Sequence, residues 1–121
     1  MKNSLLIGNY IYDVISNMNV PTFPVMAEQG TTFPFCVYRR VGLSAQDTKD
    51  GIVDDIVTYE INVYSKGYKE GLTLINNIRK ALSKRYSKEG LSITDMTIVG
   101  SQEDYAQEAY WQQITYQVTV S

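Results

Sequence analysis

The chain has 121 residues, of which eleven are basic and thirteen acidic, and it contains no histidine and one cysteine. This length fits a single domain, so we expect residues 1–121 to fold as one unit. The formal net charge of −2 argues against a nucleic-acid-binding protein, because binding by phosphate neutralisation needs a basic face. Without histidine there is no imidazole base or ligand, and one cysteine cannot form a thiolate zinc site. We therefore expect no cofactor, no metal and no catalytic residue.

The first half of the chain predicts one helix, one short edge strand and one longer strand. Apolar residues recur at steps of three and four from about residue 3 to residue 17, which is typical of an amphipathic helix. The linking stretch at residues 20–34 contains all three prolines, and Val25 and Met26 within it fit a short edge strand. Residues 35–41 then alternate in the way that a strand does.

The second half predicts three strands and a second helix. Residues 56–64 alternate between apolar and polar side chains, which indicates a strand with one buried face. Residues 67–86 carry an apolar stripe at helical spacing, with basic residues gathered near the C-terminal end where the helix dipole favours them. Two further strands are expected over about residues 91–100 and 110–120.

This α-β-β-α-β-β order predicts a single α+β domain. We expect an antiparallel sheet of about four strands, made of two hairpins, with two helices packed on one face. The other face would present a set of polar side chains to water or to a partner: Thr58, Glu60, Asn62, Gln113, Thr115, Gln117 and Thr119.

Two polar stretches lack periodicity and are expected to be loops, at residues 42–55 and 101–109. The first contains a group of charged residues, Asp47, Lys49, Asp50, Asp54 and Asp55. Their spacing does not match a calcium-binding loop, so a solvated loop is the preferred interpretation. The second stretch contains four candidate contact residues, Gln102, Glu103, Asp104 and Tyr105, and the aromatic pair Tyr110 and Trp111 follows it directly. Because tyrosine and tryptophan are favoured at protein interfaces, we predict subunit or channel contacts within residues 44–55 and 101–108 and at the aromatic pair that follows.

Neither a signal peptide nor a membrane span is expected. The apolar residues near the N-terminus are interrupted by Asn9, Tyr10, Tyr12 and Asp13, and no small-residue cleavage pattern follows them. No apolar run approaches the ~18 residues that a membrane-spanning helix needs. We therefore expect a cytosolic protein that does not contact membranes.

Three segments together carry a family resemblance. An N-terminal helix and a proline-containing stretch lead into FPFCVYRR, residues 33–40. After a polar loop comes VTYEINVYSKGYKEGLTLINNIRKAL, residues 57–82, in which a strand ending in Tyr64 and Ser65 runs directly into a helix. The last segment is EDYAQEAYWQQITYQVTV, residues 103–120. In this order the segments resemble the bacteriophage tail-completion proteins of long-tailed phages, which are also called tail-terminator or head-tail joining proteins.

That resemblance implies a structural, non-enzymatic protein of virion assembly. Such proteins form a ring, commonly a hexamer, at the end of the tail tube, where the ring stops tube growth and joins the tube to the head connector. The implied partners are other copies of the chain, the tail-tube protein and the head-connector protein. Genome DNA would pass through the channel without sequence-specific binding, and carboxylates lining a channel would repel its backbone. The implied location is the virion tail, with the bacterial host cytoplasm as the place of assembly.

Two other interpretations stay open. The order of elements also resembles a circular rearrangement of the ferredoxin-like sandwich, which would make the chain a small-ligand or regulatory module with Tyr59, Tyr64 or Tyr116 in its pocket. An enzyme would have to use Cys36 or a carboxylate. Because no histidine is present to lower its pKa, we interpret Cys36 as a small buried apolar residue.

Overall fold

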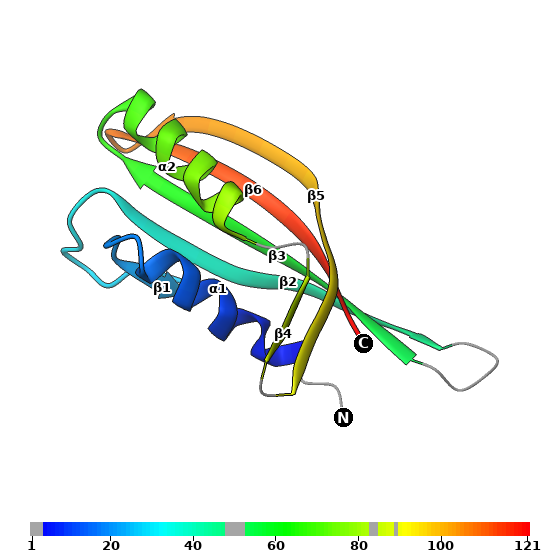
Figure 1. Cartoon of the computed structure of the whole chain (residues 1–121). Coiled ribbons are helices and arrows are strands. Elements are labelled where there is room, and N and C mark those ends of the chain that lie inside the picture. The colour runs from blue at the N-terminus through cyan, green and yellow to red at the C-terminus, as the bar shows by residue number, and fades with distance from the viewer. Residues whose placement is uncertain (1–3, 48–52, 83–84, 89) are drawn as a thin grey trace.

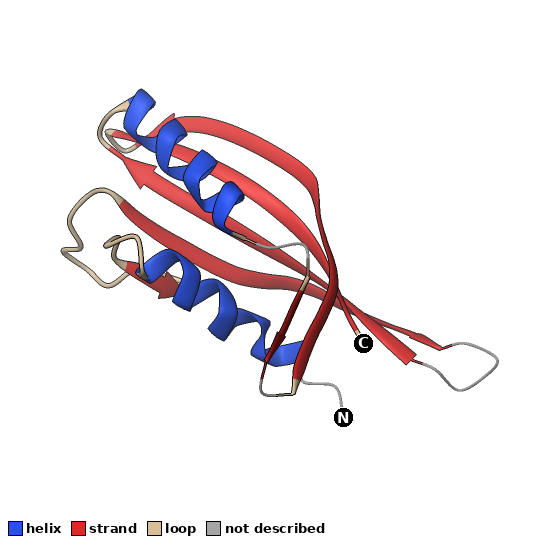
Figure 2. Cartoon of the chain, viewed as in Figure 1, coloured by secondary structure: helices blue, strands red, loops and turns tan. Residues whose placement is uncertain are grey.

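The computed structural model describes residues 4–47, 53–82, 85–88 and 90–121. These residues form two helices and six strands, and strands make up most of the structure (Figures 1 and 2). In chain order the elements are a 3₁₀ turn (Ser4–Leu6), α1 (Ile7–Ser16), β1 (Thr22–Pro24), β2 (Phe35–Asp47), β3 (Val53–Ser65), α2 (Tyr68–Ala81), β4 (Tyr86–Lys88), β5 (Leu91–Ala106) and β6 (Ala109–Val120). Neither helix of the described residues is long and apolar enough to cross a membrane.

All six strands belong to one mixed sheet in the order β1-β2-β3-β6-β5-β4. The short strand β1 runs parallel to β2, and every other neighbouring pair is antiparallel. The prediction of an antiparallel sheet of about four strands is therefore wrong. The two additional strands, β1 and β4, have three residues each, which is too short for alternation to reveal them. The edge strand expected at Val25 and Met26 lies instead at Thr22–Pro24.

The sheet curls into a half-barrel, and both helices lie on its concave side (Figure 1). Helix α1 contacts β1 and β2 at one end of the strand order. It also meets β4 at the other end, where the rings of Tyr10 and Tyr86 pack edge to face with centroids 4.1 Å apart. The curvature therefore brings the two ends of the sheet against the same helix. We call the concave side the helix side and the opposite side the helix-free side.

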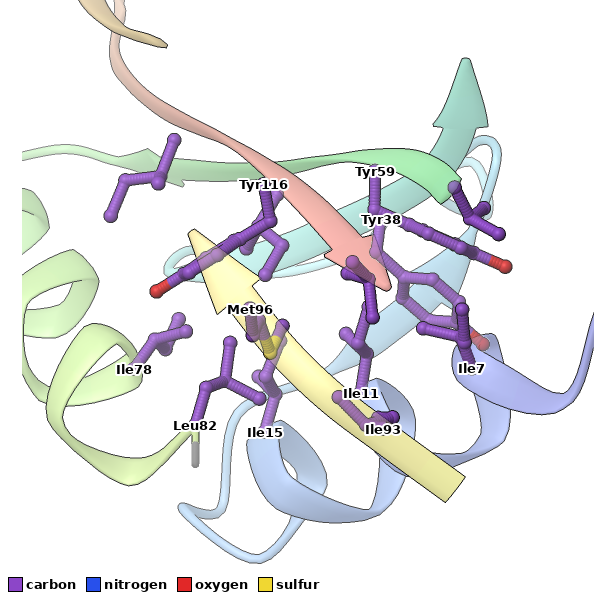
Figure 3. Packing of buried hydrophobic residues seen from close by; sticks show 14 of the residues in the cluster. Ile7, Ile11, Ile15, Tyr38, Tyr59, Ile78, Leu82, Ile93, Met96 and Tyr116 are labelled. Carbon is purple, nitrogen blue, oxygen red and sulfur yellow. The ribbon is translucent and has the colours of Figure 1, made fainter. Parts of the chain in front are cut away.

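The hydrophobic core fills the space between the helices and the sheet (Figure 3). Ile7, Ile11 and Ile15 are fully buried, because their four-residue spacing places them on one face of α1. On the sheet, alternate residues of β3 and β6 point to the helix side and are buried: Val57, Tyr59, Ile61, Val63, Ile114, Tyr116, Val118 and Val120. Alternation therefore identified the buried faces of these two strands correctly.

The second helix differs from the sequence prediction at its C-terminal end. It ends at Ala81, and Tyr86 begins β4 instead of extending the helix. Leu72, at a position that fits the apolar spacing of residues 67–86, is exposed, whereas Ile75 and Ile78 are buried. Near its start, Gly71 lies so close to Ser65 of β3 that a Cβ atom would overlap the Ser65 hydroxyl. A residue without a side chain is therefore what lets α2 pack down on the sheet here.

Most of the two polar stretches expected to be loops is strand. Strand β2 continues to Asp47 and β3 begins at Val53, while β5 continues to Ala106 and β6 begins at Ala109. In these parts the side chains of residues 43–45 and 101–106 are exposed on both faces of the strands. Because alternation of apolar and polar residues arises only where one face is buried, the sequence pattern is absent here.

Candidate functional site: the two hairpin ends of the sheet

The predicted contact residues fall into two groups at opposite ends of the molecule (Figure 1). The β2–β3 hairpin projects as a two-stranded arm beyond β6, whose last residue, Val120, pairs with Asp55. Asp54 pairs with Gln46, and Asp47, the last residue of β2, pairs with Val53. Of the remaining predicted residues, Lys49 and Asp50 lie outside the described residues.

The carboxylate of Asp55 links this arm to the N-terminus of the described chain. It accepts a hydrogen bond from the hydroxyl of Ser4, which is buried. Asp54 and Asp55 are both partly buried. Among the described residues, no group of three or more histidine, cysteine, aspartate or glutamate side chains is placed to hold a metal ion.

The β5–β6 hairpin closes in a two-residue turn at the other end of the sheet. Ala106 pairs with Ala109, and the two turn residues have positive φ angles, 52° at Gln107 and 63° at Glu108. Such turns normally use asparagine or glycine, because other residues are strained in this region. The ammonium group of Lys66, which follows β3, donates a hydrogen bond of 3.0 Å to the carbonyl of Glu108 and so holds the turn against the next strand.

On the helix side of this hairpin lie three tyrosines whose rings contact one another in series, and one of them binds a carboxylate. We call Tyr68, Glu103, Tyr105, Tyr110 and Gln112 the tyrosine cluster. The Tyr68 hydroxyl and the Gln112 amide donate to the same oxygen of Glu103, at 2.9 and 3.0 Å. The ring of Tyr110 contacts Tyr68 edge to face and lies 4.7 Å, centroid to centroid, from Tyr105. The hydrogen bond to Glu103 raises the pKa of Tyr68, because it favours the protonated phenol.

On the helix-free side, amide side chains form a second network. The Asn62 side-chain oxygen accepts hydrogen bonds of 2.8 Å from the Trp111 indole and from the Gln113 amide. Its nitrogen donates to the carbonyl of Val37 at 3.3 Å. Gln113 in turn accepts a hydrogen bond of 2.6 Å from Gln102 of β5. We call Asn62, Gln102, Trp111 and Gln113 the amide network; it links β2, β3, β6 and β5 across the sheet.

The structure places the predicted contact residues of the second group on one hairpin, but it divides them between the two faces of the sheet. Glu103, Tyr105 and Tyr110 lie on the helix side of the β5–β6 hairpin, whereas Gln102 and Trp111 lie on the helix-free side. Asp104 accepts a hydrogen bond of 2.8 Å from the Tyr105 backbone. Their role in subunit or channel contacts stays a prediction.

Sequence reasoning missed four partners of these residues. Tyr68, at the first turn of α2, and Gln112 contact Glu103, while Asn62 and Gln113 anchor the amide network. Asn62 and Gln113 are register partners in β3 and β6 and are buried. The only sequence signal was their place on the polar face of two alternating strands.

The three tyrosines proposed for a ligand pocket do not line one pocket. Tyr59 and Tyr116 are cross-strand neighbours within the hydrophobic core, whereas Tyr64 lies on the helix-free side and stacks on Phe35 at 5.0 Å. Cys36 is also buried in the core, and burial raises its pKa to about 12. A thiol with that pKa is protonated at neutral pH and is a poor nucleophile.

Comparison with known proteins adds a family and a related fold. Residues 21–121 match the family described as Tail completion protein gp17. A search of curated proteins finds no match. A chain of the solved structure "Virion of native gene transfer agent (GTA) particle" has a similar fold, with a TM-score of 0.68 and 8% sequence identity over 91% of this chain and 90% of that chain.

The family match spans α2 and all six strands, so it covers both hairpin ends described above. It confirms the resemblance drawn from the strand and helix segments of the sequence. The chain belongs to the bacteriophage tail completion protein gp17 family and is a structural protein of the phage tail.

Proposed function

We propose that copies of this chain form a ring, commonly of six subunits, at the end of the tail tube. The ring terminates the tube, joins it to the head connector, and catalyses no reaction. The observation that carries the proposal is membership of the tail completion family over residues 21–121. The fold shared with a chain of a gene transfer agent virion supports a place in the virion, reached after assembly in the host cytoplasm.

The two hairpin ends suit a subunit that stands between two different partners. The arm with Asp54 and Asp55 and the hairpin with the tyrosine cluster lie at opposite ends of the strands. If the strands run roughly along the ring axis, one end meets the tail-tube protein and the other meets the head connector. The predicted contact residues of both polar stretches then lie at the two axial faces of the ring.

The helix-free side of the sheet suits a channel for DNA. Thr58, Thr97, Gln102, Gln117 and Thr119 share this side according to the strand register. Among the described strand residues, its one cation is Arg39, which is paired with Glu60 at 2.9 Å. A face without free cations offers the phosphate backbone little attraction, so DNA can move past it without being held.

Deleting the gene from its phage or prophage tests the proposed function. Particles produced after deletion should have tubes of uncontrolled length and heads without tails, as seen by negative-stain electron microscopy. Supplying the wild-type chain from a plasmid should restore joined particles and serves as the control. Joined particles with tails of normal length in the absence of the chain would overturn the proposal.

A further inference from the structure

Both long edges of the sheet carry a free segment. Strand β1 pairs with β2 only at residues 36–38, and β4 pairs with β5 only at residues 91–93. Beyond these pairs, residues 39–45 of β2 and residues 94–106 of β5 have no strand on their outer side within the described chain. We call them the β2 edge and the β5 edge. Their outward backbone groups are available to another strand.

The two edges share features that are unusual for exposed edges. Neither contains the lysine or proline residues with which proteins often protect a free strand. The large apolar side chains that are exposed in the described strands all lie on these two edges: Val41, Leu43, Val99 and Tyr105, at 44%, 53%, 55% and 55% exposure. Both features are expected of a surface that is covered after assembly.

Charge distinguishes the two edges from each other. The β2 edge contains two cations, Arg39 and Arg40, and no anion, whereas the β5 edge contains three anions, Asp95, Glu103 and Asp104, and no cation. Pairing of an edge with its own kind would place like charges together, and pairing of unlike edges would place opposite charges together. The charges therefore favour head-to-tail contacts, which close into rings, over a twofold dimer.

The strand directions and bends of the two edges also match. Strands β2, β3, β6 and β5 alternate in direction, so β5 runs opposite to β2. Rotation about an axis along the strands would therefore place the β5 edge of one copy antiparallel to the β2 edge of the next. The β2 edge has one register shift, at Val41, and the β5 edge has two, at Thr94 and at Val99; the shifts at Val41 and Val99 both lie beside the Tyr59–Tyr116 pair. Since such shifts bend a strand, the two edges bend at the same level.

We propose that adjacent copies join by pairing the β2 edge of one with the β5 edge of the next, so that one antiparallel sheet continues around the ring. This inference rests on the proposed ring. The partner at each edge is a second copy of this chain, with Arg39 and Arg40 facing the carboxylates of the neighbouring β5 edge.

Thiol cross-linking in assembled particles tests the pairing. The gene-deleted phage is complemented with chains carrying Val41→Cys, Val99→Cys or both, and purified particles are treated with a short bis-maleimide. The native Cys36 is buried and stays unreacted. The double variant should give a ladder of linked oligomers on a denaturing gel, whereas each single variant should stay monomeric. Dimers from a single variant, or no ladder from the double variant in intact particles, would overturn the edge pairing. Neither result would contradict the proposed ring.

A charge exchange provides a second test that does not depend on cysteine variants. Arg39→Glu alone and Asp104→Lys alone, both on the helix-free side, should each lower the yield of joined particles about tenfold or more, which corresponds to ~1.4 kcal/mol at the contact. The two changes in one chain should restore much of the yield, because the opposite charges still meet. Lys80→Glu, at an exposed position of α2, is the control and should leave the yield unchanged. Equal loss in the single and the double variants, with each purified chain folded by circular dichroism, would contradict the pairing.

Discussion

The buried amide of Asn62 should be the most sensitive polar position of the sheet. Replacing it by alanine removes one hydrogen bond to the Val37 carbonyl and two from Trp111 and Gln113. Gln113 is 6% exposed, and its oxygen is already held by Gln102, so its amide cannot simply turn to water. The change therefore leaves a buried donor without a partner, a cost of about 1–3 kcal/mol that includes its lost bond, and the other two lost bonds add roughly 0.5 kcal/mol each.

We expect Asn62→Ala to lower the free energy of unfolding by about 3 kcal/mol, a large part of the ~5–15 kcal/mol of a typical domain. The melting temperature should fall by roughly 10 °C. Urea unfolding followed by circular dichroism measures the change. Gln117→Ala, on the same side of the sheet but exposed, is the matched control and should stay within about 0.5 kcal/mol of the wild type.

A double-mutant cycle separates the hydrogen-bond network from a general packing effect. Trp111→Phe removes the indole N–H that donates to Asn62. In that background Asn62→Ala leaves one fewer donor without a partner, so it should cost about 1 kcal/mol less than in the wild type. The hydrogen-bond network does not stabilise the sheet as described if Asn62→Ala lowers the free energy of unfolding by less than about 1 kcal/mol, or if the effects of the two substitutions on that free energy are additive.

Three further predictions concern single sites in the core. Gly71→Ala should destabilise the chain by about 1–3 kcal/mol because its Cβ would overlap the Ser65 hydroxyl; Gly42→Ala, whose Cβ would make only ordinary contacts with Thr58, should cost much less in the same urea titration. Tyr116→Phe should raise the melting temperature, since the buried hydroxyl finds no hydrogen-bond partner among the described residues; an unchanged or lower value would contradict this. The Cys36 thiol has a pKa near 9 in the unfolded chain and near 12 in the folded chain. Between these pH values the free energy of unfolding of the wild type should fall by up to about 1.4 kcal/mol per pH unit relative to that of Cys36→Ala. Parallel pH profiles of the two proteins would refute the raised pKa.

Periodicity predicted the parts of the fold that have one buried face. Val57, Tyr59 and Ile61 alternate with polar residues because β3 separates the core from the helix-free side, and α1 has its isoleucines at steps of four for the same reason. The short strands β1 and β4 could not be predicted in this way. Three residues hold too little pattern, and each strand forms because a long neighbour offers it a template.

The candidate site was predictable only as a list of residues. Glu103, Tyr105 and Tyr110 were singled out by type and by their place in an irregular stretch. Their contacts depend on the register of β5 with β6 and on the position of α2 on the sheet, which places Tyr68 beside Glu103. Asn62 and Gln113 meet across 51 positions of the chain because β3 and β6 pair directly. Local sequence contains no information about such distant pairings.

The two stretches that were mistaken for loops illustrate a more general limit. A strand edge that awaits another copy has both faces and its backbone in water while the chain is alone, so burial imposes no alternation on it. What selection can still act on is the fit to the neighbour: exposed valines, no protecting lysine, and charges of one sign on each edge. Within the proposed ring, the irregular pattern of residues 42–45 therefore reflects contacts between copies, whereas residues 101–106 lie at the end of the sheet that meets an axial partner. The packing of a single chain contains neither contact.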